Sequence, residues 1–363
     1  MIPSRSPTLE GILRRSTAAL LLAAALVLTG QHTSAQALLF SLFERYLDSL
    51  RQQAGIPGLS AAIVQDGETV WETGLGYQDL ESSVRATSTT PYPVGDLTQT
   101  FASVLLMQCV ERGSLLLDER LAKWSADAGE LKLWQALSHT GSTGSNPFKY
   151  DPATFAKLTP ALDACGGQSA RTRVARDVFA FLAMIDSVPG RDLQDEASDA
   201  RPSFDSTELQ RYSAVLSRLA VPYKVDKRGK ATRSDYASKR IDASTGLIST
   251  AHDLAKYDAA LDDPRHILLH DAGLTAMWSN VTPAGMPRPT GLGWFVQTYN
   301  GQRLIWHFAN VPDAYSALIL KVPARHLTLI LLANSDGLSA PFDLAQGDVS
   351  SSLFAVTFLR LFL

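Results

Sequence analysis

Cysteine and histidine, the side chains that most often bind transition metals, are scarce in this chain. Two cysteines and seven histidines occur in 363 residues. Only His266 and His270 have a helical spacing, with Asp271 after them, and no third ligand pattern accompanies the pair, which can equally lie on a solvated face. We therefore expect no catalytic metal and no other cofactor.

Long hydrophobic runs are also missing. The longest run, from Ala18 to Leu28, is shorter than the about 20 residues that a transmembrane helix needs. Arg14 and Arg15 precede it and Ala35-Gln36-Ala37 follows it, which is the pattern of a signal peptide with a small-x-small cleavage site. We predict a leader over residues 1–37 and a mature protein without a membrane span, exported to a periplasm or out of the cell.

No charge of one sign dominates the composition. The chain has 33 basic and 36 acidic residues, and removal of the leader would leave 30 and 35. Such a mild acidic balance gives no indication of a nucleic-acid or anionic-membrane partner.

The two cysteines, Cys109 and Cys165, are not expected to pair. An exported protein can form disulfides, but Cys109 lies in the apolar helical pattern from Val104 to Val110. A cysteine in such a pattern packs as a small hydrophobic side chain.

Residues 38–363 show no internal repeat and are enough for one large domain or two closely packed lobes. The Asn300-Gly301 pair between two apolar runs is a strong hairpin signal. Two polar segments, Asp186–Ser206 and Lys224–Arg240, are predicted to be surface loops, with Lys227-Arg228-Gly229-Lys230 at a solvated hairpin tip. The other expected elements are a helix over Leu39–Gln53, two strands around Asp66-Gly67, a mainly helical insertion over roughly 97–240, four strands ending near Ala333, and a last amphipathic helix near Ser352–Leu361.

Short fragments along the chain keep a fixed order, namely Gly58–Ala62, Asp66-Gly67, Gly74–Gly76, Thr90–Gly95, Val110–Gly113, Leu117-Asp118, Leu137–Gly141, Gly246–Thr250, Asp253-Leu254, Gly291–Trp294 and Leu332–Asn334. Together they resemble the serine β-lactamase and penicillin-binding-protein-like family, in its class C β-lactamase, esterase and D-alanyl-peptidase branch. The resemblance implies an α+β fold of the β-lactamase/transpeptidase type, an α/β/α sandwich. Its antiparallel sheet is flanked by helices, and a helical lobe is inserted between strands.

The catalytic serine and lysine that the resemblance implies are not in their expected places. In that family a Ser-x-x-Lys pair opens a helix, so that hydroxyl and amine both face the cleft. Here the register gives Asp96-x-x-Gln99. No lysine in the chain has a serine three residues before it, and Thr154-x-x-Lys157 stands in the wrong context.

Asp96 and Gln99 have a structural interpretation. Aspartate is among the best N-cap residues, and glutamine three residues later can complete a capping box ahead of a helix over Phe101–Cys109. Two alternatives stay open, Asp96 as a carboxylate nucleophile and another use of the pocket. No acid–base partner for a nucleophilic Asp96 is evident in the sequence.

The resemblance places two further elements at the site. The family's Tyr-x-Asn triplet corresponds, in the register set by Tyr212, to Thr207-Glu208-Leu209, which lacks both the phenol and the amide. Its Lys-Thr-Gly or His-Thr-Gly strand motif corresponds to His307-Phe308-Ala309, where only the histidine is kept. His307 can bind a ligand or simply pack on its strand. Family geometry implies oxyanion donors at the backbone N–H groups of Asp96 and Asn310.

These substitutions predict loss of catalysis. In another serine hydrolase, loss of the nucleophile or its base costs about 10⁶ in kcat, and a carboxylate beside the oxyanion hole opposes the developing charge. We therefore predict an exported, inactive relative that keeps a cleft for a peptide-like or cell-wall-derived ligand. The alternatives are an active hydrolase that uses Thr98, Ser103 or Ser142, and a decayed paralogue without retained activity.

Overall fold

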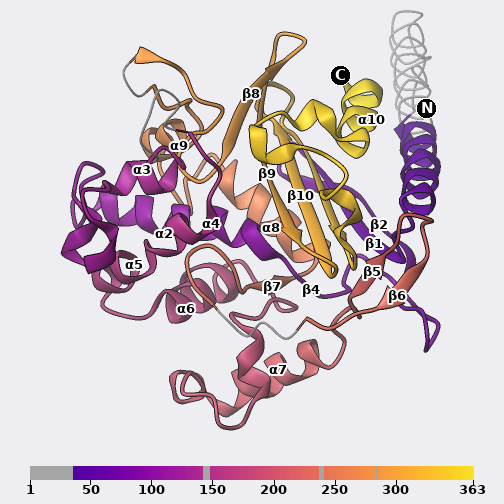
Figure 1. Cartoon of the computed structure of the whole chain (residues 1–363), viewed down its shortest axis with the longest axis horizontal. Coiled ribbons are helices and arrows are strands. Elements are labelled where there is room, and N and C mark those ends of the chain that lie inside the picture. Colours follow the sequence, from indigo (N-terminus) through magenta and orange to yellow (C-terminus); the bar gives the residue numbers. More distant parts are fainter. Residues whose placement is uncertain (1–35, 142–147, 237–240, 283–284) are drawn as a thin grey trace, which may run out of the picture.

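The computed structural model describes residues 36–141, 148–236, 241–282 and 285–363. Most of the predicted leader, residues 1–37, lies outside these ranges. The centre of the fold is a seven-stranded antiparallel sheet with the order β3-β2-β1-β11-β10-β9-β8 (Figure 1). Its strands are β1 (Gly58–Gln65), β2 (Glu68–Asp79), β3 (Val84–Arg85), β8 (Phe295–Tyr299), β9 (Gln302–Val311), β10 (Tyr315–Val322) and β11 (Leu327–Ala333).

Two-residue turns set the register of two hairpins in this sheet. Asp66 and Gly67 join β1 to β2 with φ values of 53° and 79°, and Asn300 and Gly301 join β8 to β9 with φ values of 47° and 75°. Positive φ at both positions matches the right-handed twist of the flanking strands, which is why Asn-Gly and Asp-Gly are favoured there. Both predicted hairpins are confirmed.

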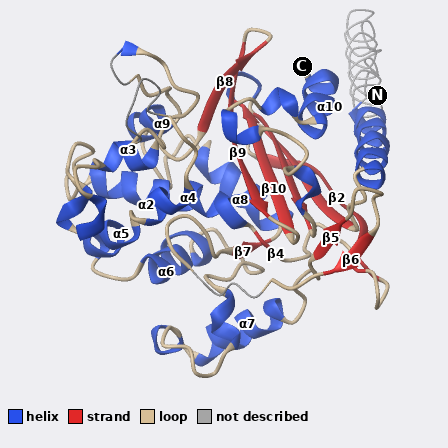
Figure 2. Ribbon diagram, viewed as in Figure 1, coloured by secondary structure: helices blue, strands red, loops and turns tan. Residues whose placement is uncertain are grey.

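The sheet is covered on both faces, so its central strands are buried throughout (Figure 2). On β9, Ile305 and Ala309 face one hydrophobic core, whereas Leu304, Trp306 and Phe308 face the other. This alternation follows from the two-residue period of a strand. The expected helix–sheet–helix layering is therefore present.

The first and last helices cover one face of the sheet together. The N-terminal helix is described over residues 36–53, and α10 spans Leu353–Phe362. Their contact is aromatic: the ring of Phe43 lies 6.0 Å from that of Phe358 and 5.5 Å from that of Phe362. Both helices stand where the sequence predicted them.

The other face carries α8 (Ala251–Leu261) and α2 (Thr98–Glu111). A buried ion pair ties α8 to the sheet, because the ammonium group of Lys321 on β10 donates to Asp258 and, at 2.9 Å, to Asp262. Beyond α2, Figure 1 shows the helical lobe. Its other α-helices in the described ranges are α3 (Leu133–Leu137), α4 (Pro152–Ala156), α5 (Thr159–Gly166), α6 (Ala170–Arg173), α7 (Ser206–Leu216) and α9 (Asp271–Met277), and a π-helix over Val174–Ala180 continues α6.

Two small sheets complete the described structure. Strands β4 (Tyr92–Pro93) and β7 (Ile248–Ser249) pair at the base of the lobe. The hairpin of β5 (Tyr223–Val225) and β6 (Ala231–Arg233) has the basic cluster Lys227–Lys230 at its exposed tip, as predicted. Within the described ranges, no helix is both long and apolar enough to cross a membrane.

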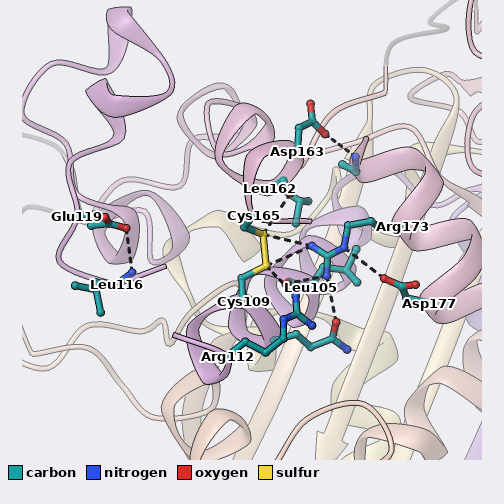
Figure 3. The surroundings of a disulfide bond; sticks show 12 residues. Leu105, Cys109, Arg112, Leu116, Glu119, Leu162, Asp163, Cys165, Arg173 and Asp177 are labelled. Carbon is teal, nitrogen blue, oxygen red and sulfur yellow. Dashed lines mark hydrogen bonds and ion pairs between the residues drawn. A yellow bond between two sulfur atoms is a disulfide. The ribbon is translucent and has the colours of Figure 1, made fainter. Parts of the chain in front are cut away.

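The prediction for the cysteines is wrong. Cys109, near the end of α2, forms a disulfide with Cys165 in α5, with Cα atoms 6.1 Å apart (Figure 3). Cys109 is fully buried in the apolar pattern that the sequence showed. Burial of that kind is compatible with a disulfide as well as with a free thiol, and the packing of α5 against α2 brings the second sulfur into reach.

Candidate functional site

The candidate site lies where the start of α2 meets β9. A turn of 3-10 helix, Gly95–Leu97, leads directly into α2. Gly95 has a φ of 51°, and a Cβ at this position would lie 3.0 Å from side-chain atoms of Ala309 and of Val311. The backbone of the Asp96 corner therefore rests directly on β9, and only a small residue fits between them.

Asp96 and Gln99 do not form the predicted capping box. The residue that precedes α2 is Leu97, and no side chain caps the helix N-terminus. Asp96 lies one residue earlier, in the 3-10 turn. The side chain of Gln99 is completely buried, and its hydrogen bonds go to Tyr150 and His139, which lie outside α2. Gln99 therefore makes hydrogen bonds to residues distant in the sequence in place of the predicted capping interaction.

These partners form a chain of hydrogen bonds with a single direction. The backbone N–H of Asp151 donates to Nδ1 of His139 at 3.1 Å, so Nε2 carries the proton and donates to Oε1 of Gln99 at 3.0 Å. The amide nitrogen of Gln99 then donates to the hydroxyl of Tyr150 at 3.3 Å. The Tyr150 hydroxyl donates to Oδ2 of Asp96 at 3.0 Å. Each group donates a hydrogen bond to the next one, and the last acceptor is the carboxylate of Asp96.

His139 also holds the segment that carries Tyr150. Its carbonyl oxygen accepts a hydrogen bond from the backbone N–H of Lys149 at 2.9 Å, while its ring accepts from Asp151. The rings of His139 and Tyr150 lie 4.6 Å apart. His139 has a φ of 54°, a conformation that is uncommon for a residue other than glycine. These contacts of His139 hold the Tyr150 side chain beside Asp96.

Tyr150 was not among the site residues predicted from the sequence, and it places a phenol beside Asp96, where the sequence predicted none. The register set by Tyr212 pointed instead to Thr207 and Leu209, which lie on α7, where Leu209 packs in a separate small core. The structure does not bring these two residues to Asp96. The signal that could have found Tyr150 is its place as the first tyrosine after the fragment Leu137–Gly141.

The strand motif that begins with His307 lies beside Tyr150. His307 lies on β9, is almost completely buried, and has its Nδ1 atom 2.8 Å from the carbonyl oxygen of Phe308. The ring of Tyr150 lies 6.2 Å from that of His307 and 5.1 Å from that of Phe308. Asn310 is exposed near the end of the same strand. The structure thus gathers Asp96, Gln99 and His307 around Tyr150.

Burial sets the protonation state of the cluster. It lowers the pKa of His139 to about 4 and that of His307 to about 3, with a smaller contribution to His307 from His139. Burial, together with the carboxylate of Asp96, raises the pKa of Tyr150 well above its usual value. At neutral pH both imidazoles are therefore uncharged, and Tyr150 keeps its proton.

Two of the hydroxyls proposed as displaced nucleophiles, those of Thr98 and Ser103, are buried away from the Tyr150 hydroxyl. Thr98 is buried, and its hydroxyl oxygen accepts from the backbone N–H of Leu247 at 3.3 Å. The hydroxyl of Ser103 is buried in α2 without a hydrogen-bond partner. Ser142 lies outside the described residues. In the described ranges, no group of three or more His, Cys, Asp or Glu side chains is arranged to hold a metal ion.

The bond between Tyr150 and Asp96 can be measured in a double-mutant cycle. Hydrogen bonds to charged groups contribute about 1.5 to 3 kcal/mol, so Tyr150→Phe should lower the free energy of unfolding by about 2 kcal/mol. In an Asp96→Asn background the same substitution should cost distinctly less. Urea unfolding of the four proteins at pH 7 gives the coupling energy, and a coupling near zero would contradict the arrangement described here.

Comparison with known proteins shows the family of the chain. A model of the Beta-lactamase family matches residues 43–349, which is well over half of the chain. The chain belongs to the beta-lactamase family. The match includes the Asp96 corner, Tyr150 and His307, so all parts of the candidate site lie within the region that defines the family.

Curated relatives align with most of this chain. Protein flp of Staphylococcus aureus is 33% identical over 310 residues, which cover 78% of this chain and 60% of that protein. The unguisins hydrolase ungD' of Aspergillus campestris is 25% identical over 316 residues, which cover 77% and 59%. The chain thus spans about three fifths of the length of these relatives.

Solved structures share the fold at low sequence identity. The octameric penicillin-binding protein homologue from Pyrococcus abyssi superposes with a TM-score of 0.70 at 19% identity, covering 88% of this chain and 77% of that chain. D-amino acid amidase from Ochrobactrum anthropi, complexed with L-phenylalanine amide, gives a TM-score of 0.64 at 18% identity, covering 88% and 99%. The β-lactamase/transpeptidase-like fold expected from the sequence is confirmed.

Proposed function

We propose that this protein is an exported, catalytically inactive member of the beta-lactamase family that keeps its cleft for binding a peptide-like or cell-wall-derived ligand. The observation that carries the proposal is the hydrogen bond from Tyr150 to Asp96. Acyl transfer by the family's mechanism needs a nucleophile and a base that can take its proton. The group that stands beside Tyr150 is a carboxylate, and the proton of Tyr150 is already committed to it.

The electrostatics of the cluster support inactivity. With its pKa raised well above the usual value, Tyr150 cannot serve as a general base near neutral pH. The side-chain amide of Gln99 is neutral, and both its oxygen and its nitrogen are engaged. The backbone N–H of Asp96, one of the oxyanion donors that the resemblance implies, belongs to the residue that carries the negative charge. A carboxylate there would destabilise a developing oxyanion.

A retained ligand-binding role is supported by features of the Asp96 cluster that cost folding free energy. His139 and His307 are buried and neutral, a strained backbone position presents Tyr150, and a polar chain of bonds is satisfied inside the lobe. One relative by fold is complexed with an amino acid amide, and we propose a ligand with a comparable amide group. Export follows from the leader pattern, and the mass of the secreted chain should correspond to a start after Ala37.

The proposal is tested by intact-protein mass spectrometry after incubation with a fluorophosphonate and, separately, with a penicillin. We expect no adduct on the wild-type protein, because loss of a nucleophile or base in a related chemistry costs about 10⁶ in kcat. We expect an adduct on the Asp96→Ser/Gln99→Lys double variant, which restores hydroxyl and amine beside Tyr150. A matched triple variant that adds Tyr150→Phe should label more slowly.

A stoichiometric adduct on the wild-type protein would overturn inactivity and favour a hydrolase with a displaced nucleophile. Peptide mapping would then identify the acylated residue, with Thr98, Ser103 and Ser142 as the first positions to inspect. Labelling of the double variant alone would indicate that the probes reach the cleft and that the wild type fails for chemical reasons.

A further inference from the structure

A hollow of about 330 Å³ lies at the edge of the large sheet where β2 turns into β3. Three parts of the chain enclose it, namely the end of the N-terminal helix with the residues that follow it, the β2–β3 edge, and the β5–β6 hairpin, which Figure 1 shows beside that helix. Asp96, Tyr150 and His307 are not among its lining residues. This edge pocket is therefore separate from the candidate site.

The tip of the β5–β6 hairpin packs against one wall of the edge pocket. Gly55, which lines the pocket, has a φ of 68°, and a Cβ there would lie 2.6 Å from the carbonyl oxygen of Gly229 at the tip. Only glycine allows this close approach. Within the tip, Oδ1 of Asp226 accepts from the backbone N–H groups of Arg228 and Lys230 at 2.8 and 2.9 Å. The acid of the tip is thus bound to the backbone of the turn.

Four exposed basic side chains at the edge pocket and on the hairpin tip are available to a partner, namely Arg85, Lys227, Arg228 and Lys230. Within the described residues, no side-chain hydrogen bond or ion pair engages any of the four. The acids close by already have partners. Glu81 pairs with Arg233 at 2.6 Å. Asp48 pairs with Arg51 at 2.7 Å, and Asp79 accepts from two backbone N–H groups of the β2–β3 turn.

Arg85 is held in place by an aromatic ring. It stands opposite Tyr77 in the pairing of β2 with β3, and its guanidinium carbon lies 4.4 Å from the centroid of the Tyr77 ring. A guanidinium that lies over a ring keeps its N–H donors in its own plane, where a carboxylate can accept two of them at once. Because the ring limits the motion of Arg85, less conformational entropy is lost when an anion binds.

The wall between these cations is apolar. Ile56, Pro57 and Ala231 line the edge pocket, and Leu80 at its mouth is 38% exposed. Val84, on the same sheet edge, is 43% exposed. A single exposed leucine is ordinary on a protein surface, but Leu80 adjoins a hollow with cations around it. The edge pocket therefore offers an apolar contact and anion-binding groups side by side.

We propose that the edge pocket docks a short acidic peptide segment of another protein. An apolar side chain of the segment lies against Leu80 and Ala231, and its carboxylates lie at Arg85 and at the cations of the hairpin tip. The apolar wall favours a peptide over a phosphate polymer, which has no apolar group to bury there. The docking surface goes beyond the proposed function, because it shares no residue with the Asp96 cluster and needs no ligand in the cleft.

The test is fluorescence anisotropy of labelled pentapeptides mixed with the full chain at pH 7 and low salt. In the first peptide a central phenylalanine is flanked by two aspartates on each side. The second peptide has asparagine in place of every aspartate, and the third has serine in place of phenylalanine. We expect the first peptide to bind about tenfold more tightly than either of the others, and to weaken as salt screens the exposed charges.

Three results would overturn the proposal. Equal affinities of the aspartate and asparagine peptides would remove the role of charge, and equal affinities of the phenylalanine and serine peptides would remove the role of the hollow. Inorganic polyphosphate that binds more tightly than the first peptide would make the surface a general anion site. No saturable binding of the first peptide at millimolar concentration would likewise overturn docking.

Substitutions at exposed positions locate the binding. Arg85→Gln and Arg228→Gln should each weaken the first peptide about threefold, as expected for single exposed charge pairs, and their combination about tenfold. Leu80→Ser should weaken the first peptide and leave the serine peptide unchanged. The matched control is Arg325→Gln, an exposed arginine in the turn after β10 and outside the edge pocket, which should bind as the wild type does. Unchanged affinity in the Arg85→Gln/Arg228→Gln variant would place the peptide elsewhere and overturn the site.

Discussion

Acidification from pH 7 to pH 4 should destabilise the folded protein by about 3 kcal/mol for each of the two histidines buried at the candidate site. The folded-state pKa values are about 4 for His139 and about 3 for His307, below the ordinary value of 6.5. Between pH 6.5 and these values the unfolded chain binds more protons than the folded one. The stabilisation is therefore complete above pH 6.5 and is lost as the pH falls toward 4.

Urea unfolding at pH 7 and at pH 4 measures this loss, and a variant separates it from the protonation of carboxylates. His307→Phe removes one titrating group and should lose about 3 kcal/mol less than the wild type over the same pH interval. His326→Asn is the control, because His326 is exposed in a turn with a φ of 46° that asparagine tolerates. The same pH dependence in wild type and His307→Phe would show that His307 is not buried and neutral.

Loss of the disulfide should lower the free energy of unfolding by about 4 kcal/mol. The bond closes a loop with a sequence separation of 56 residues, and the chain-entropy estimate for such a loop is of that size. The bond joins α2, which carries the candidate site at its other end, to α5 in the lobe. Guanidinium unfolding of the wild type and of the Cys109→Ser/Cys165→Ser variant gives the difference.

Chemical reduction of the disulfide gives a second measurement of its contribution to stability. A guanidinium nitrogen of Arg173 donates to both sulfur atoms at 3.4 Å, and Arg112 donates to Cys109 at 3.3 Å (Figure 3). Wild type reduced with dithiothreitol should unfold at nearly the same guanidinium concentration as the double serine variant. A difference below about 1 kcal/mol between oxidised and reduced protein would contradict a stabilising role for the bond.

The turns and helices that depend on local interactions were predictable from local sequence patterns. The turns at Asp66-Gly67 and Asn300-Gly301 were found because each demands two residues with positive φ, a property that the two residues carry themselves. The first and last helices were found for the same reason, since amphipathic periodicity belongs to the segment alone. The family's fragments then gave the fold in which these elements are arranged.

The errors arose where a partner far along the chain competes with a local one. Gln99 satisfies the sequence rule for a capping box, but His139 and Tyr150, 40 and 51 residues later, take both ends of its amide. The sequence around Cys109 is typical of a core residue, whereas its pairing with Cys165 depends on the packing of α5 against α2. Tyr150 was missed because the register was set from Tyr212, on a helix that packs in a different core.

The aromatic contact between the first and last helices has a topological consequence. The ring of Phe40 lies 5.8 Å from that of Phe362, so the two ends of the described domain leave the molecule side by side, as Figure 1 shows. A short glycine-rich linker could join them, and new termini could be opened at the exposed turn of Asn300 and Gly301 between β8 and β9. Such a circular permutant would preserve every contact among Asp96, Tyr150 and His139, and the domain could equally be inserted as one unit into a loop of another protein.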